Sequence, residues 1–259
     1  MKLAPTIVWF RRDLRVADNP ALLAAIQRGG PVVPVYIWAP EEEGSGAPGG
    51  AQRWWLHQSL TALGAELARL GSLLIVRQGS SLAVLRLLVE ETGAQAIHWN
   101  RLYEPTTTPR DMAIKEHFLA LKIEAKSHAA ALLFEPSIIR NKSDKPFQVF
   151  SPFWKHLLTL GEPREPFPAP TSLPPCPSNI PSVPISDLSL PPKIDWAASI
   201  QAVWQPGEVG GAQMLAQFAD GIADGYAETR NRPDVRGTSR LSPYLHFGEV
   251  SPHQVWHTL

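Results

Sequence analysis

Short apolar runs alternate with helix-forming segments through the first half of the chain. Five runs, most of them rich in β-branched and aromatic residues, have the length of buried strands and lie at 6–10, 31–38, 73–77, 96–100 and 123–128. The segments between them carry helical periodicity or helix-boundary residues and lie at 19–30, 52–71, 81–93 and 109–121. Buried strands separated by helices pair as a parallel sheet covered on both faces. The pattern therefore predicts an α/β domain in residues 1–132, built on a doubly wound parallel five-stranded sheet.

Proline interrupts this pattern in the middle of the chain. Residues 162–193 contain proline throughout, and proline fits neither a helix interior nor a central strand. This stretch is predicted to run extended over the surface as a semi-rigid linker. We place it in a connecting segment, residues 133–205, that separates the α/β domain from the C-terminal residues.

The remaining residues, 206–259, have a helical pattern. In 206–230, four apolar side chains recur on one helical face, namely Met214, Leu215, Phe218 and Ile222. The pairs Ser242-Pro243 and Ser251-Pro252 each predict a helix start, with serine as the cap and proline in the first turn.

At the C-terminal end of the last of these helices the sequence has no capping residue, polar tail or closing glycine. This pattern indicates an N-terminal piece of a longer protein, with an incomplete helical domain in residues 206–259. In such a piece the apolar side chains of Met214, Leu215, Phe218 and Trp256 would lack their usual cover. We therefore expect residues 1–160 to fold as a stable unit and residues 206–259 to be loose.

Composition limits the class of protein. Apolar residues make up 44% of the 259 positions and charged residues 19%, with a formal net charge of zero, which is an ordinary globular balance. The N-terminus does not resemble a signal peptide, and no apolar run is long enough to span a membrane. A single cysteine, Cys176, allows no internal disulfide and favours a reducing compartment. We expect a cytoplasmic monomer in which any binding site for a polyanion is a local patch.

The first strand lacks the usual nucleotide-binding fingerprints. Neither GxGxxG nor GxxxxGK[ST] follows it. Instead Arg11, Arg12 and Arg15 lie where the strand ends, at the sheet edge where open α/β sheets bind ligands. The alternative is structural: these arginines pair with Asp13 and Asp18 and orient the loop.

A second polar segment, WNRLYEP at 99–105, follows the fourth strand. Its polar side chains are predicted to face the same crevice, and they are Asn100, Arg101, Tyr103 and Glu104. The carboxylate of Glu104 has two open interpretations, a contact with a donor-rich heterocycle or a structural salt bridge.

Residues 228–252 concentrate groups that bind phosphate. Four arginines lie among hydroxyls and glycines in this stretch, namely Arg230, Arg232, Arg236 and Arg240. The hydroxyls of Thr238, Ser239 and Ser242 precede or begin a helix, where backbone N–H groups and the helix dipole favour anions. Gly237 allows a close backbone approach. The stretch predicts a pyrophosphate cradle, and the alternative is a capped helix start with solvent-facing arginines.

Four segments together resemble the photolyase/cryptochrome family, in the same order and over essentially the whole chain. They are WFRRDLRVADNPAL, WNRLYEP, the proline-rich linker and YAETRNRPDVRGTSRLSPYLHFGEVSPHQVW. The resemblance implies an α/β domain that holds a light-harvesting antenna, followed by a helical domain that holds FAD. It implies that Tyr226 lines the FAD site and that Arg230 contacts damaged DNA. The run that would wrap the FAD phosphates is Thr238, Ser239, Arg240, Leu241 and Ser242.

The implied activity is light-driven repair of cyclobutane pyrimidine dimers, in which photoexcited reduced FAD donates an electron to a flipped-out lesion. The cofactor carries that chemistry, so no catalytic side chain and no metal ligand is assigned. The alternatives are a cryptochrome-type blue-light receptor, a non-enzymatic remnant, and a nucleotide-binding or electron-transfer α/β protein unrelated to repair.

Two departures from the family pattern affect the cofactors. Thr106 and Thr107 occupy the positions where folate-binding relatives carry Asn-Glu. The antenna is therefore a deazaflavin, a folate held in another way, or absent. The residues matching the family's electron-relay tryptophans, the position facing flavin N5 and much of the dimer pocket would lie after residue 259, so FAD retention by this chain is itself a question.

Overall fold

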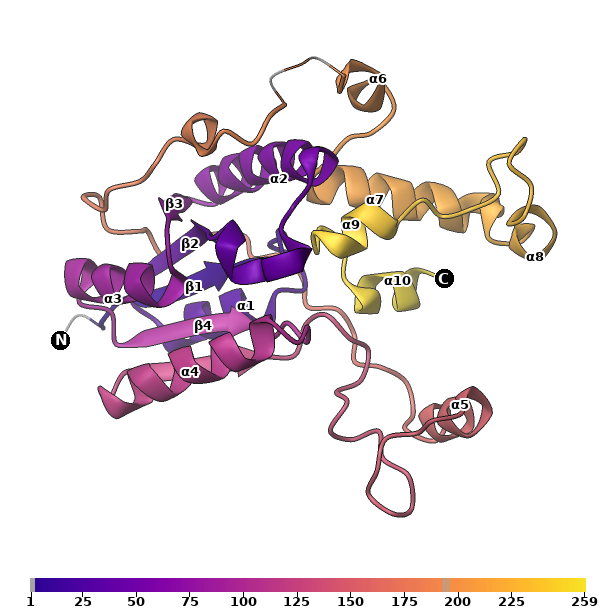
Figure 1. Cartoon of the computed structure of the whole chain (residues 1–259), viewed down its shortest axis with the longest axis horizontal. Coiled ribbons are helices and arrows are strands. Elements are labelled where there is room, and N and C mark those ends of the chain that lie inside the picture. Colours follow the sequence, from indigo (N-terminus) through magenta and orange to yellow (C-terminus); the bar gives the residue numbers. More distant parts are fainter. Residues whose placement is uncertain (1–2, 193, 195) are drawn as a thin grey trace.

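A computed structural model describes residues 3–192, 194 and 196–259, and its core is a parallel sheet (Figure 1). The strands are β1 (Thr6–Phe10), β2 (Val32–Trp38), β3 (Ile75–Gln78), β4 (Ala96–Asn100) and β5 (Glu124–His128). They run in the order β3-β2-β1-β4-β5, and every neighbouring pair is parallel. The predicted doubly wound five-stranded sheet is confirmed, with β1 at its centre and the change of winding direction beside it.

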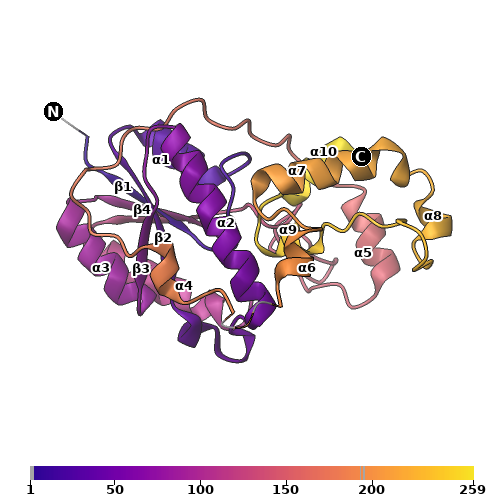
Figure 2. The same cartoon turned by 90° about the horizontal axis from the view of Figure 1, so that it is seen from above.

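Four helices cover the two faces of the sheet, α1 (Pro20–Arg28), α2 (Gly50–Arg69), α3 (Ser81–Thr92) and α4 (Thr107–Ala120). The first two pack on one face and the last two on the other, as Figure 2 shows from above. The start of α1 follows from Asn19, whose side chain accepts a hydrogen bond from the Leu22 backbone N–H at 3.1 Å. Asn19 rather than Asp18 is therefore the cap of this helix.

The proline-rich stretch 162–193 runs extended for most of its described length, as predicted, within a longer connecting segment. That segment contains α5 (Phe150–Leu157), a 3-10 turn (Ile185–Leu188) and α6 (Ala198–Gln201). The proline-rich stretch is anchored on the α/β domain by its sparse apolar residues, since Leu173, Leu188 and Leu190 are buried in the core that α2 covers. No helix was predicted at α5, which nevertheless forms.

The helical part consists of α7 (Glu208–Gln217), a single π turn (Phe218–Ile222), α8 (Tyr226–Thr229), α9 (Ser242–His246) and α10 (Pro252–Thr258). The expectation of one helical run through 206–230 is wrong, because Asp220 (ψ 70°) and Gly221 (φ 94°) leave the helical region. The predicted cap of α10 is confirmed: the Ser251 side chain accepts from the Gln254 backbone N–H at 3.0 Å. Ser242 is instead the first residue of α9 and makes no cap bond.

The helical part shares one core with the α/β domain. Leu215, Tyr244 and Phe247 belong to the same buried cluster as the β1 and α2 side chains, and Phe218 is buried as well. The expectation that Leu215 and Phe218 lack cover is therefore wrong, because α9 and α8 lie against them, whereas Trp256 remains 39% exposed.

Polar contacts also join the two parts. The Leu14 backbone N–H donates to the Phe247 carbonyl at 3.1 Å, and the Glu208 carboxylate accepts from the N–H groups of Val16 and Ala17 at 2.8 and 2.9 Å. These bonds fasten the loop after β1 to α7 and α9. None of the described helices combines the length and apolar character needed to cross a membrane.

Limited proteolysis tests how far the helical part is ordered. We expect trypsin to cut first after Arg230 and Arg236 in the exposed stretch, whereas the bond after the buried Arg15 is cut last. Mass spectrometry of a timed digest identifies these cuts. Because α7, α9 and α10 share the core of the α/β domain, we now expect only the residues around 219–240, and not all of 206–259, to be loose. Early loss of α9 and α10 would contradict this narrowing, and equal resistance of 1–160 and 206–259 would contradict the expectation that the sequence raised.

Candidate cofactor sites

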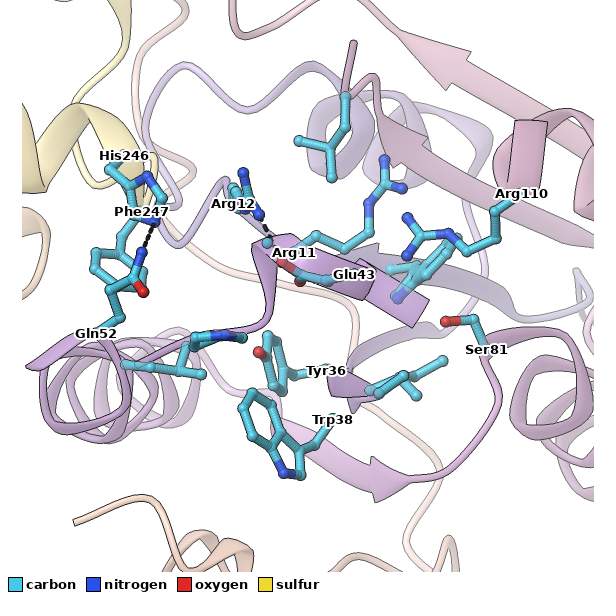
Figure 3. A pocket seen from close by; sticks show the side chains of 17 residues that line it. Arg11, Arg12, Tyr36, Trp38, Glu43, Gln52, Ser81, Arg110, His246 and Phe247 are labelled. Atoms are coloured by element: carbon cyan, nitrogen blue, oxygen red, sulfur yellow. Dashed lines mark hydrogen bonds and ion pairs between the residues drawn. The ribbon is translucent and has the colours of Figure 1, made fainter. Parts of the chain in front are cut away.

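A hollow lies at the carboxyl edge of the sheet, where β1 and β2 end (Figure 3). Elements far apart in sequence line it: the ends of β1 and β2, the starts of α2, α3 and α4, and α9. Figure 3 shows arginines along one side and Tyr36 and Trp38 along the other. The side chains that define it are Trp9, Arg11, Arg12, Trp38, Gln52, Ser81, Arg110, His246 and Phe247.

Two residues that line this hollow carry buried donors without a partner. The Nε1–H of Trp9 and the Nε–H of Arg11 are buried and have no hydrogen-bond partner among the described residues. Buried donors are normally satisfied, so this pair suits a ligand that presents acceptor atoms. The cavity volume of the hollow is only about 50 Å³. A ligand of chromophore size therefore requires lining side chains to move aside.

Ion pairs hold the arginines around the hollow. Arg11 pairs with Asp111 at 2.6 Å, and Arg12 pairs with Glu43 at 2.6 Å and Glu104 at 2.7 Å. Burial lowers the pKa of the Arg11 guanidinium, and the nearby Asp111 carboxylate opposes that effect. The alternative, in which acidic side chains pair with these arginines, is thus correct for Arg11 and Arg12. Their partners, however, are Asp111, Glu43 and Glu104 and not Asp13 and Asp18.

Asp13 and Asp18 serve other groups. The Asp13 carboxylate accepts from the Arg11 backbone N–H at 2.6 Å, and Asp18 pairs with Arg164 at 2.6 Å. Arg15 donates to the backbone oxygens of Gly248 and Asp18, both at 2.8 Å. Because Arg15 is buried and committed to those carbonyls, it is not available to a ligand.

The segment after β4 does not line the hollow in the predicted way. Asn100 is buried and donates to Asp13 and Asn19, and both Arg101 and Tyr103 turn to Glu135 of the connecting segment. The expectation that they face the crevice is wrong, because backbone and carboxylate partners hold them elsewhere. Of the four predicted residues, Glu104 alone approaches the rim, through its salt bridge with Arg12.

Some residues that line the hollow were not predicted from the sequence, and they fall into two groups. Ser81 lies in the first turn of α3 and Arg110 in the first turns of α4, and helices that follow parallel strands begin at the carboxyl edge of the sheet. That signal was present in the sequence. In contrast, His246 and Phe247 reach the hollow from α9, where the His246 ring lies 3.4 Å from the Gln52 amide, and no local pattern indicates this contact.

A second candidate site is the predicted phosphate cradle. Leu241 is buried, Arg240 has φ +55°, and its guanidinium lies 4.6 Å from the centre of the Trp204 ring. A Cβ on Gly237 would lie 2.4 Å from the Thr229 side chain, so the close approach expected of this glycine is real, although it is to protein. Thr238, Ser239 and Ser242 are at least partly exposed around this turn.

Tyr226 lies apart from this turn. It sits on α8, 39% exposed, with its ring against Phe218, whereas Figures 1 and 2 show α8 at the far end of the helical part from α9. The structure does not bring Tyr226 into contact with residues 238–242. A ligand that touches both would therefore have to extend from α8 to the turn before α9.

The four arginines of this region differ in their partners. Arg232 pairs with Asp234 at 2.6 Å, and Arg236 donates to Gln217 at 3.0 Å. Among the described residues, Arg230 and Arg240 have aromatic rings but no carboxylate beside them. These two guanidinium groups are therefore the ones available to phosphates. In the part of the chain that the structure describes, no group of three or more acidic, histidine and cysteine side chains is placed to hold a metal ion.

Comparisons with known proteins agree with these features. A sequence model of the DNA photolyase family matches residues 6–171. The chain is 45% identical over 259 residues to deoxyribodipyrimidine photo-lyase of Agrobacterium fabrum (strain C58), covering 99% of this chain and 53% of that protein. It is 40% identical over 261 residues to cryptochrome-1 of Arabidopsis thaliana, covering 97% of this chain and 37% of that protein.

A solved structure shows the same agreement in three dimensions. The crystal structure of a bacterial class III photolyase from Agrobacterium tumefaciens superposes with a TM-score of 0.93 at 45% identity, covering 100% of this chain and 53% of that one. The chain thus spans 53% and 37% of the lengths of these two curated relatives. It belongs to the DNA photolyase family, which comprises photolyases and cryptochromes.

Proposed function

We propose that the chain provides the chromophore-binding N-terminal half of a light-driven lyase that repairs cyclobutane pyrimidine dimers in DNA. The observation that carries the proposal is the match to a deoxyribodipyrimidine photo-lyase over 99% of this chain. Members of this family bind FAD, and some hold an antenna chromophore as well. When bound, FAD supplies the electron that splits the dimer, and the residues of this chain bind and orient their ligands.

The hollow at the carboxyl edge is the proposed antenna site. Trp9 and Arg11 offer unused donors to carbonyl or anionic acceptors of the chromophore, and Trp38 and Phe247 offer ring faces. Thr106 and Thr107 do not line the hollow. Their departure from the folate-binding pattern therefore leaves this hollow intact for a deazaflavin or for a folate held in another way.

The turn at residues 238–242 is the proposed site for the FAD phosphates, with Tyr226 along the flavin. Arg240 fits this role, because it rests on Trp204 and keeps its N–H groups free of protein acceptors. Arg230 is exposed at the C-terminal end of α8, with its guanidinium near the Tyr226 ring, and is proposed to bind a phosphate of the damaged strand. We further propose that the protein works as a cytoplasmic monomer.

The first test is whether the full chain retains FAD. The near-UV and blue absorption spectrum is recorded before and after incubation with excess FAD and desalting. A retained flavin band, lost in Arg240→Ala and kept in Arg232→Ala, supports the cradle. A colourless protein would count against flavin binding by this chain alone and would favour the non-enzymatic alternative.

The antenna site can be tested with one matched pair of variants. Trp9→Phe removes an unpartnered buried indole N–H from a residue that lines the hollow, whereas Trp99→Phe removes one from a residue that does not. Because one hydrogen bond contributes about 1 kcal/mol, we expect Trp9→Phe to weaken chromophore binding about fivefold and Trp99→Phe to leave it unchanged. Fluorescence titration with a deazaflavin and with a reduced folate, each in turn, measures this. Equal losses of chromophore affinity in both variants would mean that the effect comes from core packing and not from a hydrogen bond to the ligand.

A blue-light receptor is the second candidate, favoured by the 40% identity to cryptochrome-1. The two functions share flavin binding and differ in the response of the loaded protein to light. Dimer repair under blue light, measured as loss of cyclobutane dimers from irradiated oligonucleotides, identifies a photolyase. A flavin-loaded protein that repairs nothing and shows a light-induced structural change identifies a receptor.

A further inference from the structure

The indole of Trp204 connects the end of the connecting segment to the turn at residues 238–242. Trp204 follows α6 in the chain and is partly buried. The central carbon of the Arg240 guanidinium lies over the Trp204 ring, 4.6 Å from the ring centre. Since Arg240 is the side chain proposed for the FAD phosphates, a residue far outside the turn contacts the proposed phosphate site.

Two further aromatic rings hold the Trp204 ring. Trp55 of α2 packs against it edge-on, with the ring centres 5.6 Å apart, and the ring centre of Tyr244 of α9 lies 6.2 Å away. Both of these side chains are buried, and their rings contact each other with centres 5.2 Å apart. Edge-to-face aromatic pairs favour a defined ring orientation. The Trp204 ring is therefore oriented by side chains from two different helices.

The backbone around Trp204 is held as well. The Trp204 N–H donates to the Ile200 carbonyl of α6 at 2.9 Å. On the other side of the indole, the carbonyl of Gln205 accepts from the Tyr244 hydroxyl at 3.1 Å. Trp204 is thus fixed through its ring and its backbone by contacts that do not involve Arg240.

Arg240 has a backbone conformation that needs support. Its φ of +55° lies in the left-handed region, and a residue other than glycine stays there when surrounding contacts hold it. The next residue, Leu241, is buried and fixes the backbone, whereas the Trp204 ring lies against the guanidinium. A guanidinium over an aromatic face keeps the N–H groups along its edge available to an anion.

We propose that Trp204 is a positioning residue of the phosphate site: its ring holds the Arg240 guanidinium in the orientation that binds the diphosphate of FAD. An arginine whose rotamers are already restricted loses less conformational entropy when it binds its ligand. The inference rests on the proposed function, which assigns Arg240 to the FAD phosphates. It adds to that site a residue of the connecting segment.

The competing explanation is that Trp204 only fills space at the junction with Trp55 and Tyr244. The two explanations differ in how Trp204 affects the ligand. A positioning residue acts through Arg240, so its removal has no further effect on affinity once Arg240 is gone. A residue that only supports the junction affects the site whatever side chain position 240 carries. A double-mutant cycle separates these cases.

The experiment measures the affinity of the full chain for inorganic pyrophosphate and for FAD by isothermal titration calorimetry at low ionic strength. Trp204→Leu, Arg240→Ala and the double variant are compared with the wild type. We expect Trp204→Leu to weaken binding of both probes about two- to fivefold and Arg240→Ala about tenfold or more. The double variant is expected to bind as Arg240→Ala does.

Two control variants accompany the cycle. Trp204→Phe keeps an aromatic face under Arg240 and is expected to lose less affinity than Trp204→Leu. Trp196→Leu makes the same change at another tryptophan of the connecting segment, which is 41% exposed and lies against Gly50 of α2, and is expected to bind as the wild type does. Far-UV circular dichroism shows which variants are folded. If Trp204→Leu is not, Trp204→Phe takes its place in the cycle.

Three results would overturn the inference alone. They are an unchanged affinity in the Trp204 variants while Arg240→Ala weakens binding, an equal further loss when the Trp204 change is added to Arg240→Ala, and a loss in Trp196→Leu as large as in Trp204→Leu. A wild type that binds neither probe, or an Arg240→Ala variant with unchanged affinity, would overturn the proposed phosphate site and this inference with it. The two failures are therefore distinguishable.

Discussion

Replacing Gly248 with alanine is expected to destabilise the protein by about 3–4 kcal/mol, combining overpacking with backbone strain. Gly248 has φ +65°, and a Cβ at this position would lie 2.1 Å from the Arg12 carbonyl oxygen and 2.6 Å from the Asp13 Cα. Both neighbours are backbone of the loop after β1, so neither can rotate away. The methyl group would push α9 off that loop and open the junction between the helical part and the α/β domain.

Gly93 provides a control with the same backbone conformation. Its φ is also +65°, but nothing lies within 4 Å of an added Cβ. Gly93→Ala is therefore expected to cost about 1 kcal/mol, from strain alone. Urea unfolding followed by far-UV circular dichroism measures both variants. Similar losses in the two would mean that the close approach at Gly248 is relieved at little cost.

Replacing Glu249 with alanine is expected to lower the free energy of unfolding by about 2–4 kcal/mol, the second large effect. This carboxylate is fully buried and accepts from Trp55 Nε1 at 3.0 Å, Ser59 Oγ at 2.5 Å and the Gly207 N–H at 2.6 Å. It thereby joins α2, the start of α7 and the segment before α10. Truncation leaves the Trp55 indole N–H and the Gly207 N–H without an acceptor, whereas the Ser59 hydroxyl still reaches the Trp55 carbonyl at 3.0 Å. It also forms a cavity at the junction.

The same carboxylate predicts a pH dependence. Burial raises the pKa of Glu249 from its ordinary 4.5 to about 7, against the opposing hydrogen bonds from Ser59 and Trp55. Because the folded-state pKa lies above the unfolded one, the folded protein binds this proton more tightly. The resulting stabilisation is complete below pH 4.5 and declines as the pH rises through 7. Its size is on the order of 2–3 kcal/mol.

Glu249→Gln isolates that contribution, because glutamine keeps the shape and cannot titrate. The free energy of unfolding of wild type minus that of Glu249→Gln is expected to fall between about pH 4.5 and 8. This difference removes the buried histidines from the comparison, since burial lowers the pKa values of His98 and His253 and gives the opposite slope. A flat difference would show that Glu249 is ionised throughout.

Both effects concern the junction on which the candidate antenna site depends. Gly248 and Glu249 follow directly on His246 and Phe247, which form one wall of the hollow. A variant that lifts α9 therefore loses chromophore binding as well as stability. Measuring both quantities in Gly248→Ala tells whether the hollow needs the helical part.

The order and type of the main elements could be predicted from local patterns. The strands 6–10 and 96–100 match β1 and β4 residue for residue, because short apolar runs between helices have few other places to go in a parallel sheet. The cap of α10 was likewise local, since Ser251 and Gln254 are three residues apart. Membership of the family could be predicted because the sequence motifs and their order resemble those of its members.

The partners of charged groups could not be predicted in this way. Arg11 pairs with Asp111 and not with Asp13, although the latter is two residues away, because the end of β1 and the first turns of α4 meet only after the sheet has formed. Glu249 is a similar case. The residues next to Glu249 in the sequence do not indicate that its carboxylate is a buried acceptor for Trp55 and Ser59.

The chain by itself thus determined the α/β class, the linker, the helix starts and the phosphate-seeking composition of 228–252, because these depend on residues within a few positions of one another. The tertiary structure alone decided which side chains line the hollow, that α9 completes it, that Tyr226 lies apart from residues 238–242, and that no residue of α5 is buried. These outcomes depend on packing between elements, such as the contact of Gln52 with His246, where contacts and not local preferences set the free energy.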